Sequence, residues 1–189
     1  MFHFKQSLKN VTMKKIFFTA VVVLFGAGVQ AQENSTDNVT LNVKLHPIQS
    51  LVVNPSQKEV NLEYYSKEDY QNGVAETKQD HLTVYSTGGF QVKVKSSGSH
   101  LTGGEANLNA NTVRIEAAAG SNPAGEAQYS ARQLSADNQA IISSNSGGVD
   151  KNFNITYRGG DSNAYLDYYV AGQNPTVYTT SVTYTIVAQ

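Results

Sequence analysis

Apolar and polar residues alternate with a period of two along most of this chain, and this is the feature that most restricts its fold. Val39, Leu41, Val43 and Leu45 alternate with polar residues, and the same pattern returns over residues 182–188. Successive side chains of a β-strand point to opposite faces, so this pattern predicts half-buried strands. No window shows the sustained apolar stripe of an amphipathic helix. The chain is therefore predicted to be all-β.

The predicted strands are short and separated by turn residues. There are roughly nine to eleven of them, at residues 39–45, 48–53, 60–64, 81–85, 90–95, 113–115, 129–134, 139–143, 152–157, 164–170 and 178–188. A polar stretch, Ser66–Gly73, is expected to hold a short turn of helix. Many short strands at this spacing predict an antiparallel, immunoglobulin-like β-sandwich, a single domain over residues 39–189.

One pair of strands, residues 81–85 and 90–95, is predicted to form a hairpin. The turn between them, Thr87-Gly88-Gly89, contains two glycines. Glycine supplies the positive φ angles that tight hairpin turns require. We therefore expect these strands to be neighbours in one sheet.

The first 31 residues, 1–31, have the three parts of a secretory signal peptide. Lys14 and Lys15 precede an apolar run over residues 16–25, and Val29-Gln30-Ala31 places small residues at the −3 and −1 positions of a cleavage site. The apolar run is shorter than the ~20 residues of a membrane span. The protein is therefore expected to pass through the periplasm and to be secreted or held at the cell surface.

Cleavage after Ala31 would leave a polar leader, residues 32–38, ahead of the sandwich. Met13 is an alternative start to Met1, and no lipid anchor is expected because no cysteine follows the cleavage site. The chain has 14 Lys and Arg and 15 Asp and Glu; loss of the four lysines within residues 1–31 leaves a net charge of −5. A mildly acidic surface argues against nucleic acid or an anionic membrane as the partner.

No group of residues has a pattern typical of catalysis. The chain has no cysteine, which excludes thiol catalysis and cysteine metal sites. The histidines His46, His81 and His100 lack metal-ligand spacing. Gly160-Asp161-Ser162 resembles the serine motif of GDSL-type esterases, but no histidine follows His100, so a turn is the better interpretation. No catalytic residue and no cofactor site is predicted.

Three oxygen-bearing side chains, Asp161, Asn163 and Asp167, lie close together in the sequence. Such groups can bind calcium. The glycine and the final glutamate of an EF-hand loop are missing, so no metal site is predicted.

Adjacent tyrosines occur twice, at Tyr64-Tyr65 and Tyr168-Tyr169. On a strand, one ring of each pair would face the core and the other would face solvent. We expect Tyr65 and Tyr169 to be the outward rings, which makes them candidates for binding a glycan or a protein neighbour. The alternative is that tyrosine simply covers a solvated sheet face, where its ring and its polar tip both fit.

The two terminal strands are candidates for strand exchange between molecules. The residues concerned are Val39, Leu41, Val43 and Leu45 in the first strand and Val182, Tyr184 and Ile186 in the last. A long, uncharged terminal strand promotes aggregation unless it is paired. Strand addition to a neighbouring subunit would pair both strands. The alternative is that both pair within their own domain.

Three features of the sequence together resemble those of a known protein family. They are the opening strand that runs into Pro47-Ile48, the pair of strands over residues 81–95 and the closing segment over residues 172–186. The family comprises the pilin-like proteins of the chaperone–usher and spore-coat-U group of Gram-negative bacteria. The resemblance implies an incomplete immunoglobulin-like fold, export through the outer membrane and assembly into surface fibres, with no catalytic residues. Two departures are the missing disulfide and the short, polar leader over residues 32–38, which leaves residues 39–45 as the strand that could be donated.

The function expected from the sequence is thus a structural or adhesive surface protein of fimbrial-subunit type. Its expected partners are copies of itself or other fibre subunits. The alternative is a secreted carbohydrate-binding module that uses Tyr65 and Tyr169. A secreted hydrolase is the least favoured class, because the sequence contains no recognisable set of catalytic residues.

Overall fold

The computed structural model describes residues 35–189, so the predicted signal peptide lies outside the described residues. A compact unit covers Leu45–Gln189, and the residues up to Lys44 belong to a separate unit. Within residues 35–189, no helix combines the length and apolarity that crossing a membrane would take.

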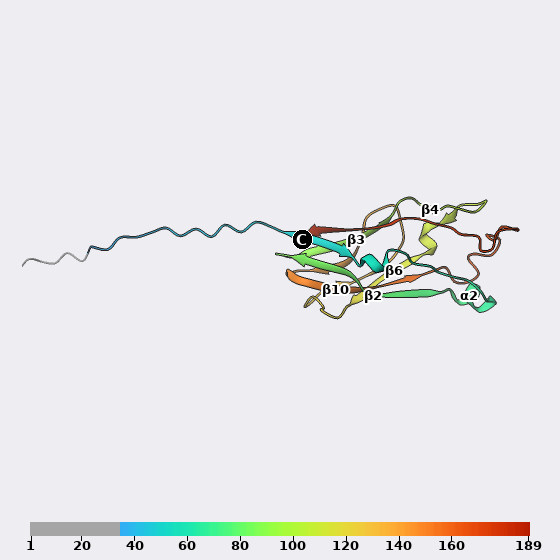
Figure 1. Cartoon of the computed structure of the whole chain (residues 1–189), viewed down its shortest axis with the longest axis horizontal. Helices are drawn as coiled ribbons and strands as arrows, with labels where there is room; N and C mark the ends of the chain where they lie inside the picture. Colours follow the sequence, from blue (N-terminus) through green and yellow to red (C-terminus); the bar gives the residue numbers. More distant parts are fainter. Residues whose placement is uncertain (1–34) are drawn as a thin grey trace, which may run out of the picture. The chain divides into compact units, whose positions relative to one another are not determined.

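The compact unit consists of two antiparallel sheets that pack face to face (Figure 1). The first sheet has the order β1 (Gln49–Val53), β2 (Ala75–Ser86), β10 (Gly148–Arg158), β6 (Arg114–Ala119) and β8 (Ala131–Gln133). The second has the order β11 (Val182–Ala188), β3 (Phe90–Ser96), β9 (Gln139–Ser144) and β7 (Gln128–Tyr129). A small ribbon pairs β4 (His100–Leu101) with β5 (Leu108–Asn109). The prediction of an all-β sandwich of antiparallel sheets is confirmed.

The hydrophobic core lies between the two sheets and includes aromatic rings from both. Phe90 of β3 and Phe153 of β10 are fully buried, and their rings meet edge to face with centroids 6.3 Å apart. Tyr129 of β7 approaches Phe153 in the same way, also at 6.3 Å. Edge-to-face pairs add to the stabilisation that burial provides, so this cluster ties the sheets together.

The predicted hairpin over residues 81–95 is wrong. Both strands exist, as β2 and β3, but β2 pairs with β1 and β10, whereas β3 pairs with β9 and β11. The turn at Thr87–Gly89 therefore carries the chain from one sheet to the other. Leu82 of β2 and Val92 of β3 are both fully buried, but they enter the core from opposite sheets. The physical reason is that crossing between the sheets buries both apolar faces as well as a hairpin would, so alternation does not distinguish the two arrangements.

The predicted helical turn is present as α2 (Lys67–Asn72). Ser66 is the N-cap, and it forms a capping box with Asp69: the Asp69 backbone N–H donates to the Ser66 hydroxyl, and the Ser66 N–H donates to the Asp69 carboxylate. A capping box satisfies two of the orphan donors at a helix start. These hydrogen bonds also hold the pKa of Asp69 below its usual value. Two further helical elements lie within residues 35–189, the 3-10 turns η1 (Pro55–Gln57) and η2 (Ala110–Thr112).

The strand predicted over residues 164–170 is absent. These residues belong to the long loop (residues 159–181) that joins β10 to β11, and they form successive turns. Asn163 and Asp167 have positive φ angles of 61° and 69°, a conformation that interrupts an extended strand. The Tyr178 hydroxyl donates to the Tyr168 carbonyl oxygen at 2.8 Å and folds the loop back on itself.

Candidate functional site

The segment over residues 39–45, called the donor segment below, exposes its apolar side chains. Val39, Leu41, Val43 and Leu45 are 93%, 85%, 76% and 88% exposed, and none of them lies in an assigned strand. The prediction of a half-buried strand here is therefore wrong for this chain by itself. The alternating pattern identifies residues suited to a sheet, but a strand also needs a paired edge, and this segment has none within the described chain.

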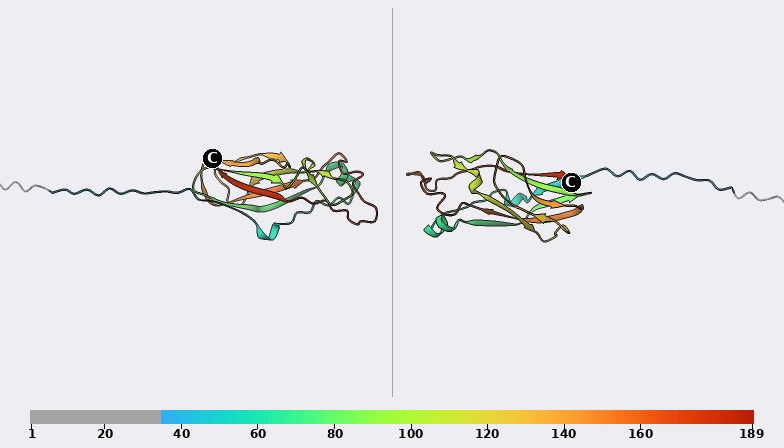
Figure 2. Two further views of the ribbon diagram at one scale, coloured as in Figure 1. Left: turned by 90° about the horizontal axis from the view of Figure 1, so that it is seen from above. Right: turned by 180° about the vertical axis from the view of Figure 1, so that it is seen from behind.

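The strands β1 and β11 form neighbouring edges of the two sheets. Within the described part of the chain, β1 pairs only with β2, and β11 pairs only with β3. The two edge strands lie close to each other at the same side of the sandwich, and β11 is the dark red arrow of Figures 1 and 2. The outer backbone groups of both strands are thus available for pairing.

A third extended stretch, residues 58–65, follows β1 and the turn η1. Val60, Leu62 and Tyr64 alternate with exposed residues and are half-buried, as predicted for a strand. No strand is assigned to the stretch, and its residues take part in none of the backbone hydrogen bonds between the described loops and strands. It therefore has the side-chain pattern of a strand without a backbone partner.

The core is incompletely covered beside these segments. Several apolar side chains pack against the buried core and yet remain partly exposed. Seven of these side chains come from β1, from residues 58–65 or from β11: Leu51, Val53, Val60, Leu62, Val182, Tyr184 and Ile186. We call these side chains, with the unpaired outer sides of β1 and β11, the open edge.

A chain of side-chain hydrogen bonds crosses the interior beside the open edge. Tyr184 of β11 bonds Tyr157 of β10 through the two hydroxyls at 2.7 Å, and the Tyr157 hydroxyl bonds His81 Nε2 of β2 at 2.9 Å. His81 Nδ1 lies 3.0 Å from Gln57 Oε1 in η1, and Gln57 Nε2 donates to the Gln79 carbonyl oxygen at 3.0 Å. Buried polar groups need such partners, and this chain links η1 and both sheets.

Sequence reasoning missed the inward position of His81, which it placed at the start of a strand. His81 and Leu82 are both buried although they are consecutive. The pairing of β2 with β10 shifts register between Phe153 and Ile155, opposite this point, and Asp80 has a positive φ of 47°. An irregularity of this kind turns a side chain to the other face, and alternation alone does not reveal it.

Burial shifts the pKa values of this hydrogen-bonded chain. It lowers the pKa of His81, with a smaller contribution from the positive charge of Lys78. Burial raises the pKa of Tyr157 to about 12. It also raises the pKa of Tyr184 well above the ordinary value, and the neighbouring Tyr157 adds to this. All three side chains are therefore neutral at pH 7.

Because His81 is neutral in the folded protein, stability is expected to fall in mild acid. Its folded pKa is lowered, so the unfolded chain, with a histidine pKa of about 6.5, takes up a proton first. The contribution of neutral His81 to the stability of the fold is thus present above about pH 6.5, and it is lost as the pH falls below that value. Urea unfolding at pH 7.5 and pH 5 should show this decrease, and His81→Gln should reduce it. An unchanged pH dependence in His81→Gln would assign the effect to other groups.

The two tyrosines proposed for glycan contact lie on separate segments of the compact unit. Tyr65 precedes α2 and is 84% exposed, and Tyr169 lies in the long loop and is 61% exposed. Their neighbours Tyr64 and Tyr168 are half-buried. Tyr65 lines the surface cavity described below, and Tyr169 is not among the residues that line it. The Tyr65 hydroxyl donates to Glu63, and this bond raises the pKa of Tyr65.

Asp161, Ser162 and Asn163 form part of a turn, as the sequence predicted for Gly160-Asp161-Ser162. Ser162 has a positive φ of 52°. The Ser162 and Asn163 backbone N–H groups donate to the carbonyl oxygens of Gln71 and Tyr70, each at 2.8 Å. The turn is therefore fastened to α2. Among residues 35–189, no cluster of His, Cys, Asp and Glu has the arrangement of a metal site.

Compared with models of protein families and with curated proteins, the chain matches none of them.

Proposed function

We propose that this chain is an exported structural subunit that assembles at the cell surface by strand addition. In this proposal the donor segment of one copy pairs with the open edge of the next. The observation that carries it is the combination of four exposed, alternating apolar side chains with a sandwich edge whose core is incompletely covered. Strand addition would satisfy both features at once, because main-chain hydrogen bonds supply affinity and alternate side chains fill the exposed apolar surface.

The lengths of the two partners match. The donor segment and β11 both span seven residues, or about 23 Å at ~3.3 Å per residue. An added strand would direct Val39, Leu41, Val43 and Leu45 toward the half-buried side chains of the open edge. Its polar residues Thr40, Asn42 and Lys44 would then face solvent. Each buried Val or Leu would contribute about 1.5–3 kcal/mol before the cost of ordering the segment.

Pairing between molecules is favoured over pairing of the donor segment with β1 of its own chain. Ile48 already pairs with Thr87, since the Thr87 N–H donates to the Ile48 carbonyl oxygen at 3.0 Å. If the donor segment, which ends at Leu45, formed a hairpin with β1, only His46 and Pro47 would remain for the turn. A type I′ turn needs positive φ at both residues, which proline cannot adopt, and a type II′ turn would need it at His46.

Export and a surface location rest on the signal-peptide features of residues 1–31. The resemblance to pilin-like proteins points to the same class of function. An adhesive role would follow from assembly into a fibre. No step of this proposal requires a cofactor.

The proposal is tested with the full chain, expressed for export and purified. Light scattering after size exclusion should show multimers that grow with protein concentration. A synthetic peptide of residues 38–46 should bind the protein and shorten these multimers. The control peptide has the same composition, in an order that breaks the alternation, and should do neither. A protein that stays monomeric at every concentration and ignores the first peptide would overturn the proposal.

A further inference from the structure

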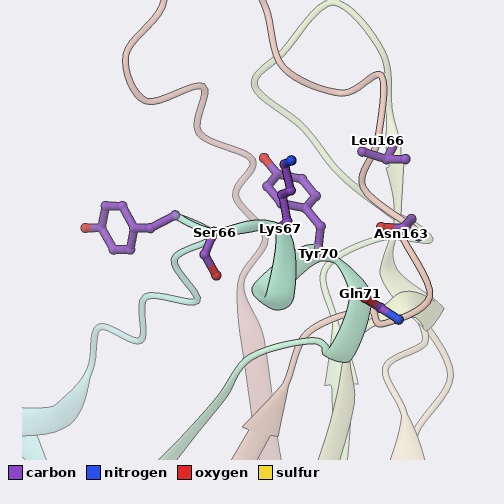
Figure 3. Close-up of a pocket in the computed structure, with 7 residues that line it drawn as sticks. Ser66, Lys67, Tyr70, Gln71, Asn163 and Leu166 are labelled. Carbon is purple, nitrogen blue, oxygen red and sulfur yellow. The ribbon is translucent and has the colours of Figure 1, made fainter.

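A surface cavity of about 390 Å³ lies between α2 and the long loop. Its walls are Lys67, Tyr70 and Gln71 from α2, Tyr65 and Ser66 just before it, and Asn163 and Leu166 from the loop. Figure 3 shows Tyr70 and Lys67 on the helix and Asn163 and Leu166 on the loop opposite. The volume falls within the ~300–1,000 Å³ typical of small-molecule sites.

The walls of the cavity are held in place by contacts behind it. Tyr64 packs its ring against Tyr70 at 5.3 Å and against Tyr165 at 5.0 Å. The Tyr64 hydroxyl donates to the Gly160 carbonyl oxygen at 2.8 Å, and the Tyr165 hydroxyl accepts from the Gly160 N–H at 3.0 Å. The capping box fixes the start of α2. The cavity is therefore largely formed before any ligand arrives.

The side chains that line the cavity offer two kinds of contact. Tyr70 and Leu166 supply apolar surface, and the Tyr70 ring can stack on a ligand. Tyr65 lies at the rim, with its hydroxyl bonded to Glu63. Lys67, Gln71 and Asn163 are exposed. The backbone of Gln71 and Asn163 makes the hydrogen bonds that fasten the loop, which leaves their amide side chains open to a ligand. An amide both donates and accepts, so it pairs well with a hydroxyl.

We propose that this cavity binds a neutral sugar, a hexose or an N-acetylhexosamine unit of a glycan. Aromatic and apolar surface suits the C–H face of a sugar ring, and the two amides suit its hydroxyls. An anionic sugar is disfavoured by its surroundings, because Glu63, Glu68 and Asp69 lie on the same stretch of chain as Lys67. The site goes beyond the proposed strand addition. It lies with α2 at one end of the sandwich, whereas β11 ends at the other (Figures 1 and 2).

The test uses the full exported chain and a panel of sugars. The probes are methyl glycosides of neutral hexoses and N-acetylhexosamines, with N-acetylneuraminic acid and glucuronic acid as the anionic members. Ligand-observed NMR followed by titration should show binding of at least one neutral sugar, with a dissociation constant on the order of millimolar. Leu166→Ala, which removes apolar surface, and Gln71→Ala, which removes an amide, should each weaken it by about tenfold.

The matched control is Tyr169→Ala, which removes an exposed tyrosine that does not line the cavity. It should leave sugar binding unchanged, and all three variants should keep the wild-type urea midpoint. Binding to no sugar of the panel, binding only to the anionic sugars, or an equal loss in Tyr169→Ala would each overturn the proposal. Multimer size is measured on the same samples and should be unaffected by Leu166→Ala, so that failure of the sugar site and failure of strand addition are told apart.

Discussion

Leu41→Asp is expected to abolish multimers of this protein at concentrations where the wild type forms them. In the proposed assembly, Leu41 lies near the middle of the donor segment and would insert among half-buried apolar side chains of the next copy. The substitution removes the burial of a leucine, about 1.5–3 kcal/mol, and puts a carboxylate without a partner into an apolar site, which costs more. A combined loss of at least about 3 kcal/mol weakens association more than a hundredfold.

Asn42→Asp is the matched control for this substitution. It adds the same negative charge one residue further along, on the side of the donor segment that would face solvent. Its effect on multimer size should be small, since an exposed charge change typically costs under ~0.5 kcal/mol. Light scattering over a concentration series compares the two variants directly. Equal loss of multimers in both would show that charge, and not the direction of the side chain, controls association.

Phe153→Ala is expected to cause a large loss of stability in the compact unit. Phe153 is fully buried, and its ring meets Phe90 and Tyr129 edge to face. Truncating a buried phenylalanine to alanine costs about 3–5 kcal/mol, because burial is lost and a cavity remains. Marginal domains of this size have only ~5–15 kcal/mol in total. The urea midpoint should therefore fall sharply.

Val149→Ala serves as the control on the same strand. Val149 is 63% exposed, so Val149→Ala should change the protein's free energy of unfolding by no more than about 0.5 kcal/mol. Urea unfolding followed by tyrosine fluorescence measures both variants. If Phe153→Ala and Val149→Ala lowered the urea midpoint equally, the aromatic cluster around Phe153 would not be what holds the two sheets together.

The alternating pattern predicted most of the strands because it reflects a local property, the two faces of a β-strand. It did not predict which strands are neighbours in a sheet. Leu82 and Val92 lie in strands that were predicted, and both are buried, but alternation does not say whether the apolar faces of two strands lie side by side or opposite each other. The same limit applies to Val39–Leu45, where the pattern was present and the partner edge was not.

The candidate sites depend on contacts between distant residues, which explains why the sequence revealed only parts of them. Tyr65 was predicted as an exposed ring, but the cavity beside it needs Asn163 and Leu166, about a hundred residues further along. His81 was taken for a strand-end residue, because the register shift that buries it depends on pairing with β10. Periodicity within one segment contains no information on either contact.

The position of β10 in the middle of the first sheet has a consequence for how the protein folds. β10 pairs with β2 and β6, and β11, at the end of the chain, pairs with β3. Both sheets thus depend on pairings that close long stretches of chain, and folding rates fall as the sequence separation of contacts grows. Pairings of this kind leave apolar strands uncovered until distant parts of the chain have met. Neither sheet can therefore be completed before the last part of the chain, which contains β10 and β11, is available to pair.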